Sequence, residues 1–107
     1  MPTINRGEVW LTDLGLAAKV RPCLVLSVPL SPPDRALVTL IPHTTSLRAT
    51  RYEVAIPKSF LKAGAFDAQG LVTVAHPRLL RKLGELQVAE MHSVEEGVKR
   101  WLGLSPA

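Results

Sequence analysis

The amino-acid sequence predicts an α+β domain that is mainly β, a small, strongly curved antiparallel barrel with one C-terminal helix. The chain has 107 residues, which is enough for one hydrophobic core, so we expect residues 1–107 to form a single domain. Apolar runs alternate with breaks at the spacing of short strands. The last segment has the spacing of an amphipathic helix instead. Strands in series followed by one helix favour a barrel with the helix packed against it.

Five apolar runs rich in Val, Leu, Ile and Thr are the expected strands. The first two flank a short loop in the pattern of a hairpin. The Leu-Ser-Pro-Pro-Asp break at residues 30–34 cannot continue a strand ladder, and Pro42 and Pro57 each mark a strand end. The expected strands span residues 9–13, 21–29, 36–43, 51–56 and 71–76.

Two helical segments are expected. Residues 57–64 have the pattern of one or two helical turns, because Pro57 stands at the start and Gly64 just past the end. A longer helix is expected over residues 88–102, where apolar side chains recur on one face, and Gly103 then ends it. That apolar face consists of Met91, Val94, Val98, Trp101 and Leu102.

The formal net charge of +4 is distributed unevenly along the chain. Residues 1–84 contain eleven Lys and Arg against five Asp and Glu, whereas residues 85–107 contain two against four. A basic body suits a nucleic acid or an acidic protein as partner. The N-terminus has no apolar signal core, and no apolar run approaches the ~20 residues that span a bilayer. We therefore expect a cytoplasmic protein without a membrane segment.

Cys23 is the only cysteine, which excludes an internal disulfide and a thiolate metal cluster. Both Cys23 and Trp10 lie in strand patterns. We expect Cys23 in the core rather than as a nucleophile, and Trp10 in the core or facing a second copy rather than stacking on a base. Asp13, Asp34 and Asp67 are far apart, and the three histidines lack ligand spacing. Neither a metal site nor a cofactor is expected.

Charged and polar side chains gather at three strand ends, namely Arg21, residues 42–46 and residues 75–78. In a curved sheet, these ends can converge on one rim. RNA cleavage without metal needs a deprotonated 2′-hydroxyl, a stabilised five-coordinate phosphorus and a protonated 5′ oxygen. Arg21 suits the second role, Thr44 can donate to a phosphate oxygen, and a histidine can transfer protons. The alternative is that the Thr-Thr-Ser run only forms a turn and Arg21 a surface ion pair.

Short motifs follow one another along nearly the whole chain. They are Arg-Gly-Glu-Val-Trp-Leu at residues 6–11, Arg-Pro at 21–22, Ile-Pro-His-Thr-Thr-Ser at 41–46, Gly-Leu-Val at 70–72, His-Pro-Arg at 76–78, Leu-Gly-Glu-Leu at 83–86 and Leu-Gly-Leu at 102–104. No single motif is specific, but the ordered set resembles the MazF/PemK (Kid) family of toxin ribonucleases.

The resemblance implies an SH3-like barrel of the Kid/MazF/CcdB type, a homodimer, and sequence-dependent cleavage of single-stranded RNA without metal. It also implies neutralisation by an acidic, MazE-like antitoxin. The catalytic Arg and Thr of the family correspond to Arg21 and Thr44 in this sequence. Further contacts with the RNA substrate are expected from Lys19, Thr45, Ser46 and Arg78.

The sequence departs from the family pattern at the positions of proton transfer. The loop at residues 14–20 has no acid or histidine, and Thr73 and Ala75 stand where the Kid-like branch has Arg and Asp. We therefore predict His76, which replaces the family's Gln, as the third catalytic residue, with His43 as the alternative. The loop also leaves a second function open, a non-enzymatic CcdB-like toxin or an RNA- or antitoxin-binding module on the same barrel.

Overall fold

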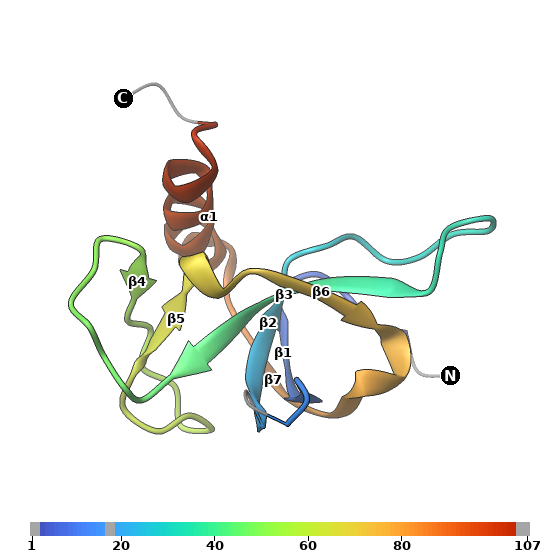
Figure 1. The fold of residues 1–107 in the computed structure, drawn as a ribbon, viewed down its shortest axis with the longest axis horizontal. Coiled ribbons are helices and arrows are strands. Elements are labelled where there is room, and N and C mark those ends of the chain that lie inside the picture. Colours follow the sequence, from blue (N-terminus) through green and yellow to red (C-terminus); the bar gives the residue numbers. More distant parts are fainter. Residues whose placement is uncertain (1–2, 17–18, 105–107) are drawn as a thin grey trace.

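The computed structural model describes residues 3–16 and 19–104. Its strands are β1 (Glu8–Asp13), β2 (Val20–Val25), β3 (Leu37–Thr44), β4 (Glu53–Val54), β5 (Ala65–Asp67), β6 (Val72–Ala75) and β7 (Leu79–Glu85), and its helix is α1 (Val88–Leu102). Two short 3₁₀ helices, η1 (Ala68–Gly70) and η2 (His76–Arg78), precede β6 and β7. Figure 1 shows a strongly bent sheet with α1 standing on one side. Within these residues, no helix is long and apolar enough to cross a membrane.

The strands form one antiparallel sheet in the order β4-β5-β3-β2-β1-β7, with β6 also paired to β3. β6 pairs with the first half of β3, and β5 pairs with its last two residues, His43 and Thr44. The 3₁₀ helix η1 separates these two partners, so β3 belongs to both halves of the bent sheet. The predicted mainly antiparallel fold with a C-terminal helix is confirmed, although the hydrogen-bonded ladder of the described strands does not close into a complete barrel.

Residues 57–64 do not form the predicted short helix. They make a single turn, closed by the hydrogen bond from Leu61 N to Lys58 O (3.1 Å), and then lead into β5. Phe60 and Leu61 are partly buried from this turn and pack against the core. This tertiary packing overrides the local helical pattern of the segment.

The buried side chains form two clusters, one on each face of the sheet. Neighbouring residues of a strand point to opposite faces, and accordingly Val9 belongs to one cluster and Trp10 to the other. The first cluster packs against α1 through Met91, Val94 and Val98, and the second contains Cys23. Burial raises the pKa of the Cys23 thiol to about 11. Cys23 therefore stays protonated near neutral pH, in the core position that the sequence predicts.

The helix α1 begins and ends where the sequence predicts. Gln87 and Glu90 form a capping box at its start, in which Gln87 N donates to Glu90 Oε1 (2.8 Å). Gly103 ends the helix in the left-handed region at φ 70°. The end of the predicted apolar face is more open than expected, because Trp101 is 43% and Leu102 50% exposed.

Glu8 links β1 to β7 from a buried position. Its Oε1 accepts hydrogen bonds from Asn5 N (2.9 Å) and Trp10 Nε1 (3.0 Å), and Lys82 Nζ lies 3.1 Å from Oε2. Burial alone would raise the pKa of Glu8, but the hydrogen bonds from Asn5, Trp10 and Lys82 outweigh it and hold the pKa at about 2. Glu8 is therefore ionised at neutral pH and fixes Trp10 within the core.

Candidate active site

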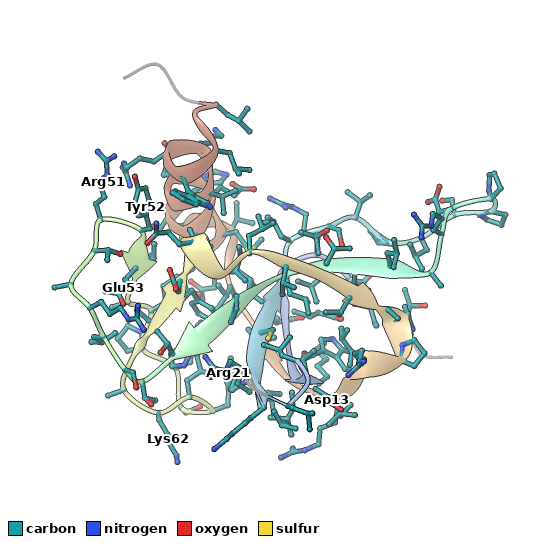
Figure 2. All side chains as sticks on the ribbon, viewed as in Figure 1. Asp13, Arg21, Arg51, Tyr52, Glu53 and Lys62 are labelled. Atoms are coloured by element: carbon teal, nitrogen blue, oxygen red, sulfur yellow. The ribbon has the colours of Figure 1, made fainter. Side chains whose placement is uncertain are left out.

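Arg21 and Thr44 lie opposite each other where β2 begins and β3 ends. The register of the two strands pairs Cys23 with Pro42, and two further residues along each strand bring Arg21 level with Thr44. Because side chains alternate between faces, both point to the face that carries Cys23. Figure 2 shows Arg21 close to the tip of the β3 arrow. Both residues line the same two pockets, so they form a rim between them.

The turn after Thr44 is held by its own hydroxyl. Thr44 Oγ1 accepts a hydrogen bond from Ser46 N (3.0 Å), while the hydroxyl proton can still be donated to a ligand. Thr45 and Ser46 are exposed, and both line a pocket beside the rim. The Thr-Thr-Ser run therefore forms a turn and also presents hydroxyl groups at the candidate site.

The first pocket has a volume of about 480 Å³ and is strongly basic. Its charged lining residues are Lys19, Arg21, Lys62 and Arg81, and no Asp or Glu is among the described residues around it. Lys62 comes from the turn before β5, below Arg21 in Figure 2, and Arg81 from β7. Four cations around one concavity suit a phosphate ligand. We call this concavity the basic pocket.

The second pocket has a volume of about 560 Å³ and a different character. It shares Arg21, Thr44 and Ser46 with the basic pocket, and its other charged lining residues are Arg48, Glu53 and Asp67. Two cations and two carboxylates balance one another, and apolar side chains of Leu14, Pro42 and Val72 complete the wall. We call it the mixed pocket.

His43 belongs to the basic pocket. The side chain is only 5% exposed and packs edge-on against Phe66, with ring centroids 5.1 Å apart. Burial lowers the pKa of His43 below its usual value of 6.5. The imidazole is therefore neutral near pH 7 and able to accept a proton.

His76 does not reach this rim, so the predicted convergence of three strand ends is wrong for His76. Its backbone N donates to Ala36 O (3.0 Å), next to the start of β3, whereas Thr44 ends that eight-residue strand, roughly 20 Å away. Because β6 runs antiparallel to β3, its last residue meets the first part of β3. Figure 1 shows the turn after β6 at the opposite end of β3 from the arrow tip.

Of the other residues predicted from the sequence, three lie at the candidate site and one lies away from it. Lys19, Thr45 and Ser46 line the basic pocket. Arg78 lines neither the basic nor the mixed pocket, and its Nη1 lies 3.7 Å from Oδ2 of Asp13 at the surface. In the described part of the chain, no three His, Cys, Asp or Glu side chains are arranged to hold a metal ion.

Lys62, Arg81 and Asp67 line the two pockets without having been indicated by the sequence. Lys62 lies in the segment with the misleading helical pattern, and Arg81 lies in β7, which the strand patterns omit. The one available signal for Arg81 is the run of Leu79, Leu80 and Leu83 that surrounds it between Pro77 and Gly84.

Comparison with known proteins gives a family and a fold. A family model described as a PemK-like, MazF-like toxin of type II toxin–antitoxin systems matches residues 5–102. An endoribonuclease in complex with its cognate antitoxin from a mycobacterial species has a TM-score of 0.82 at 28% identity, covering 97% of this chain and 99% of that one. An endoribonuclease from a mycobacterial species has a TM-score of 0.81 at 27% identity, covering 100% of this chain and 98% of that one.

The MazE–MazF structure (Form-III) from Deinococcus radiodurans shares the fold at a TM-score of 0.80 and 21% identity, covering 97% of this chain and 100% of that one. The family match spans every strand and the helix of the described structure. The chain therefore belongs to the PemK-like, MazF-like toxin family of type II toxin–antitoxin systems.

Proposed function

We propose that this chain is the toxin of a toxin–antitoxin pair and acts as an endoribonuclease. It cleaves single-stranded RNA, chiefly mRNA, in a sequence-dependent manner and without a metal ion. The 2′-hydroxyl attacks the adjacent phosphorus, the bond to the 5′ oxygen breaks, and the products carry a 2′,3′-cyclic phosphate and a 5′-hydroxyl.

The observation that carries this proposal is the position of Arg21 and Thr44 on the rim between two pockets. A guanidinium and a hydroxyl donor side by side suit the negative charge that develops on phosphate oxygens in the transition state. The basic pocket on one side of the rim supplies the cations that hold neighbouring phosphates. A strand of RNA that crosses the rim thus meets charge stabilisation at the scissile phosphate and electrostatic attraction beside it.

Arg21 and Thr44 on the rim, and His43 in the basic pocket, have distinct roles in the proposed reaction. Arg21 binds two oxygens of the scissile phosphate, and Thr44 donates a hydrogen bond to one of them. His43, neutral through burial, accepts the proton of the 2′-hydroxyl, and water protonates the departing 5′ oxygen. The RNA backbone on the basic side is held by Lys19, Thr45, Ser46, Lys62 and Arg81.

The proposal includes the partners and the compartment that such a toxin requires. Two copies of the chain form a homodimer, each copy being one domain over residues 1–107. An acidic antitoxin binds over the basic pocket and keeps RNA out, because both ligands compete for the same cations. The protein acts in the cytoplasm, where mRNA is translated.

The test is incubation of the purified chain with a long single-stranded RNA in EDTA, followed by mapping of fragment ends. We expect cuts at a defined sequence, with cyclic phosphate on one side and 5′-hydroxyl on the other. Intact RNA at enzyme concentrations that bind it would overturn the endoribonuclease proposal.

One observation favours a second candidate, a non-enzymatic binder on the same fold. The described part of the loop between β1 and β2 contributes one charged group, Lys19, to the basic pocket. The described residues that line this pocket include cations but no carboxylate. Such a surface binds polyanions even without catalysis. RNA that binds tightly and is recovered intact would support this candidate.

A further inference from the structure

The mixed pocket has a composition that does not suit a phosphate. Glu53 and Asp67 line it together with Arg21 and Arg48, and a carboxylate repels a phosphate group while it accepts hydrogen bonds from neutral N–H donors. Apolar contacts from Pro42 and Val72 complement these polar groups. A nucleobase has this combination of properties, because it presents N–H donors at its edge and apolar faces above and below.

Asp67 is the carboxylate that remains open to a ligand. Its Oδ1 accepts a hydrogen bond from Gln69 N (3.1 Å) at the start of η1, and within the described residues Oδ2 accepts none. Glu53 differs, because its two oxygens accept from the backbone N of Arg48 (2.9 and 3.2 Å) and of Thr50 (3.0 Å). Glu53 therefore shapes the loop after β3, and Asp67 is the acceptor available to a bound base.

Gly70 keeps the space beside Asp67 open. A Cβ atom at Gly70 would lie 3.6 Å from Asp67 Oδ2 and only 3.1 Å from Pro42 Cγ. A side chain at position 70 would therefore crowd Pro42 and begin in van der Waals contact with the carboxylate of Asp67. The absence of a side chain at this position leaves Asp67 accessible from the mixed pocket, on the side of the rim away from the basic pocket.

We propose that the mixed pocket binds the base of a nucleotide adjacent to the cleaved bond, and that Asp67 selects guanine there. This inference rests on the proposed endoribonuclease function. The Watson–Crick edge of guanine carries two adjacent donors, N1–H and the 2-amino group, which match Oδ2 of Asp67 and the second lone pair of Oδ1, whose first lone pair accepts from Gln69 N. Adenine and cytosine offer one amino donor, and uracil offers a single N–H between two acceptors that a carboxylate repels.

The same geometry divides the substrate between the two pockets. Phosphates lie over the basic pocket with its four cations, the scissile phosphate lies at Arg21 and Thr44, and the guanine lies in the mixed pocket. Affinity then comes mainly from the backbone contacts, whereas sequence preference comes from Asp67.

The test compares the wild type with Asp67→Asn on a randomised RNA pool, with the nucleotides around each cut counted by sequencing. Asn keeps the ability to cap η1 but replaces one acceptor oxygen with a donor. The wild type should show a guanine preference at one position next to the cut, and Asp67→Asn should reduce that preference by about 10- to 100-fold. Asp34→Asn, which changes an exposed carboxylate in the loop between β2 and β3, should leave the preference unchanged.

A second measurement does not depend on a variant that must fold. Replacing the selected guanine by inosine removes only the 2-amino group, and this should slow cleavage by the wild type by about tenfold. An unchanged guanine preference in Asp67→Asn, or equal cleavage of guanine and inosine RNA by the wild type, would overturn the assignment of Asp67 while leaving the endoribonuclease proposal intact. A wild type that binds but never cuts RNA would overturn both.

Discussion

At the scale of single residues, His43 and Thr44 show how strand geometry separates neighbours in sequence. Alternation along β3 places their side chains on opposite faces, so Thr44 forms the rim with Arg21 while His43 packs against Phe66 at the basic pocket. Burial keeps the imidazole of His43 neutral near pH 7, so its free lone pair can accept a proton, and the side chain is poorly suited to bind phosphate as a cation.

The role of His43 can be read from the pH dependence of cleavage. Since the neutral form is the base and burial lowers the pKa of His43 below 6.5, activity should stay constant near neutrality and fall as the pH drops below 6.5. His43→Gln should lose this acidic limb and cleave about 100-fold more slowly. His92→Gln on the exposed side of α1 is the matched control. A variant that keeps the limb, or that loses activity only through a lowered unfolding temperature, would make His43 structural.

Arg21 and Thr44 could be predicted from sequence because both stand at the end of a strong strand pattern, next to a proline or a turn. His76 could not be placed, because its position depends on which end of β3 meets β6, and antiparallel pairing sends it to the far end. Asp67 and Arg81 are carried by β5 and β7, and no local motif marks either residue. The site is therefore predictable only where its residues lie at, or next to, the facing ends of the two longest apolar runs, as Lys19, Thr45 and Ser46 also do.

At the scale of elements, β5 and β7 are not predicted from the sequence, and there are physical reasons for this. β5 has only three residues, too few for a period-two pattern to stand out. β7 contains Leu, Arg, Lys and Gly and none of the β-branched residues that favour strands. Its pairing with β1, and the buried Glu8 that contacts Lys82, hold it in the sheet. Tertiary contacts rather than local propensity thus create β7 and bring Arg81 to the basic pocket.

Glu8 should make the stability of the fold depend on pH. Its pKa of about 2 lies below the ordinary value of 4.5, so its contribution is complete above pH 4.5 and is lost as the pH falls from 4.5 towards 2. Glu8→Gln should lower the free energy of unfolding at pH 7 by about 2–3 kcal/mol and remove this part of the acid dependence. Urea unfolding at several pH values measures the free energy of unfolding of the wild type and of Glu8→Gln, and Glu96→Gln, which changes an exposed carboxylate, is the control. If the free energy of unfolding depended on pH in the same way for the wild type and Glu8→Gln, Glu8 would not be the source of the acid dependence.

Gly64 holds the turn before β5 against the end of β3. A Cβ atom there would overlap the backbone oxygen of Thr44 and lie 2.8 Å from His43 Cε1. Gly64→Ala should therefore destabilise the fold by about 1–3 kcal/mol and reduce cleavage, since it displaces Thr44. Gly97→Ala in α1, whose Cβ would meet Val54 Cγ2 at an ordinary 3.4 Å, should be neutral or stabilising. The test measures thermal unfolding and cleavage rates for both variants. Equal effects of Gly64→Ala and Gly97→Ala would show that the close contact of Gly64 with Thr44 does not matter.

At the scale of the whole molecule, positive charge is concentrated where RNA is proposed to bind. The acidic residues of α1 partly neutralise cations elsewhere, as Glu95 pairs with Arg6 and Glu90 with Lys58 at 2.7 Å. The basic pocket has no carboxylate among its described lining residues. Part of the excess positive charge of the sequence is therefore gathered around one concavity, which favours a polyanionic ligand.

RNA affinity should therefore depend steeply on salt. Four phosphate contacts in the basic pocket predict a log–log slope of about −3, and Lys62→Gln should make the slope shallower by about 0.7. Lys99→Gln on α1 should leave it unchanged. An acidic antitoxin peptide should displace labelled RNA from the wild type, and simultaneous binding of both ligands would show that they do not share the pocket.

The central claim is that Arg21 stabilises the scissile phosphate at the rim. The most direct test is the single-turnover cleavage rate of Arg21→Lys in EDTA, measured on an RNA with one site, with RNA affinity and unfolding temperature recorded in parallel. Lysine keeps the charge and loses the planar fork, so the rate should fall by roughly 10²–10³-fold while affinity changes little and the fold survives. A rate close to that of the wild type in a folded, RNA-binding Arg21→Lys would contradict the claim.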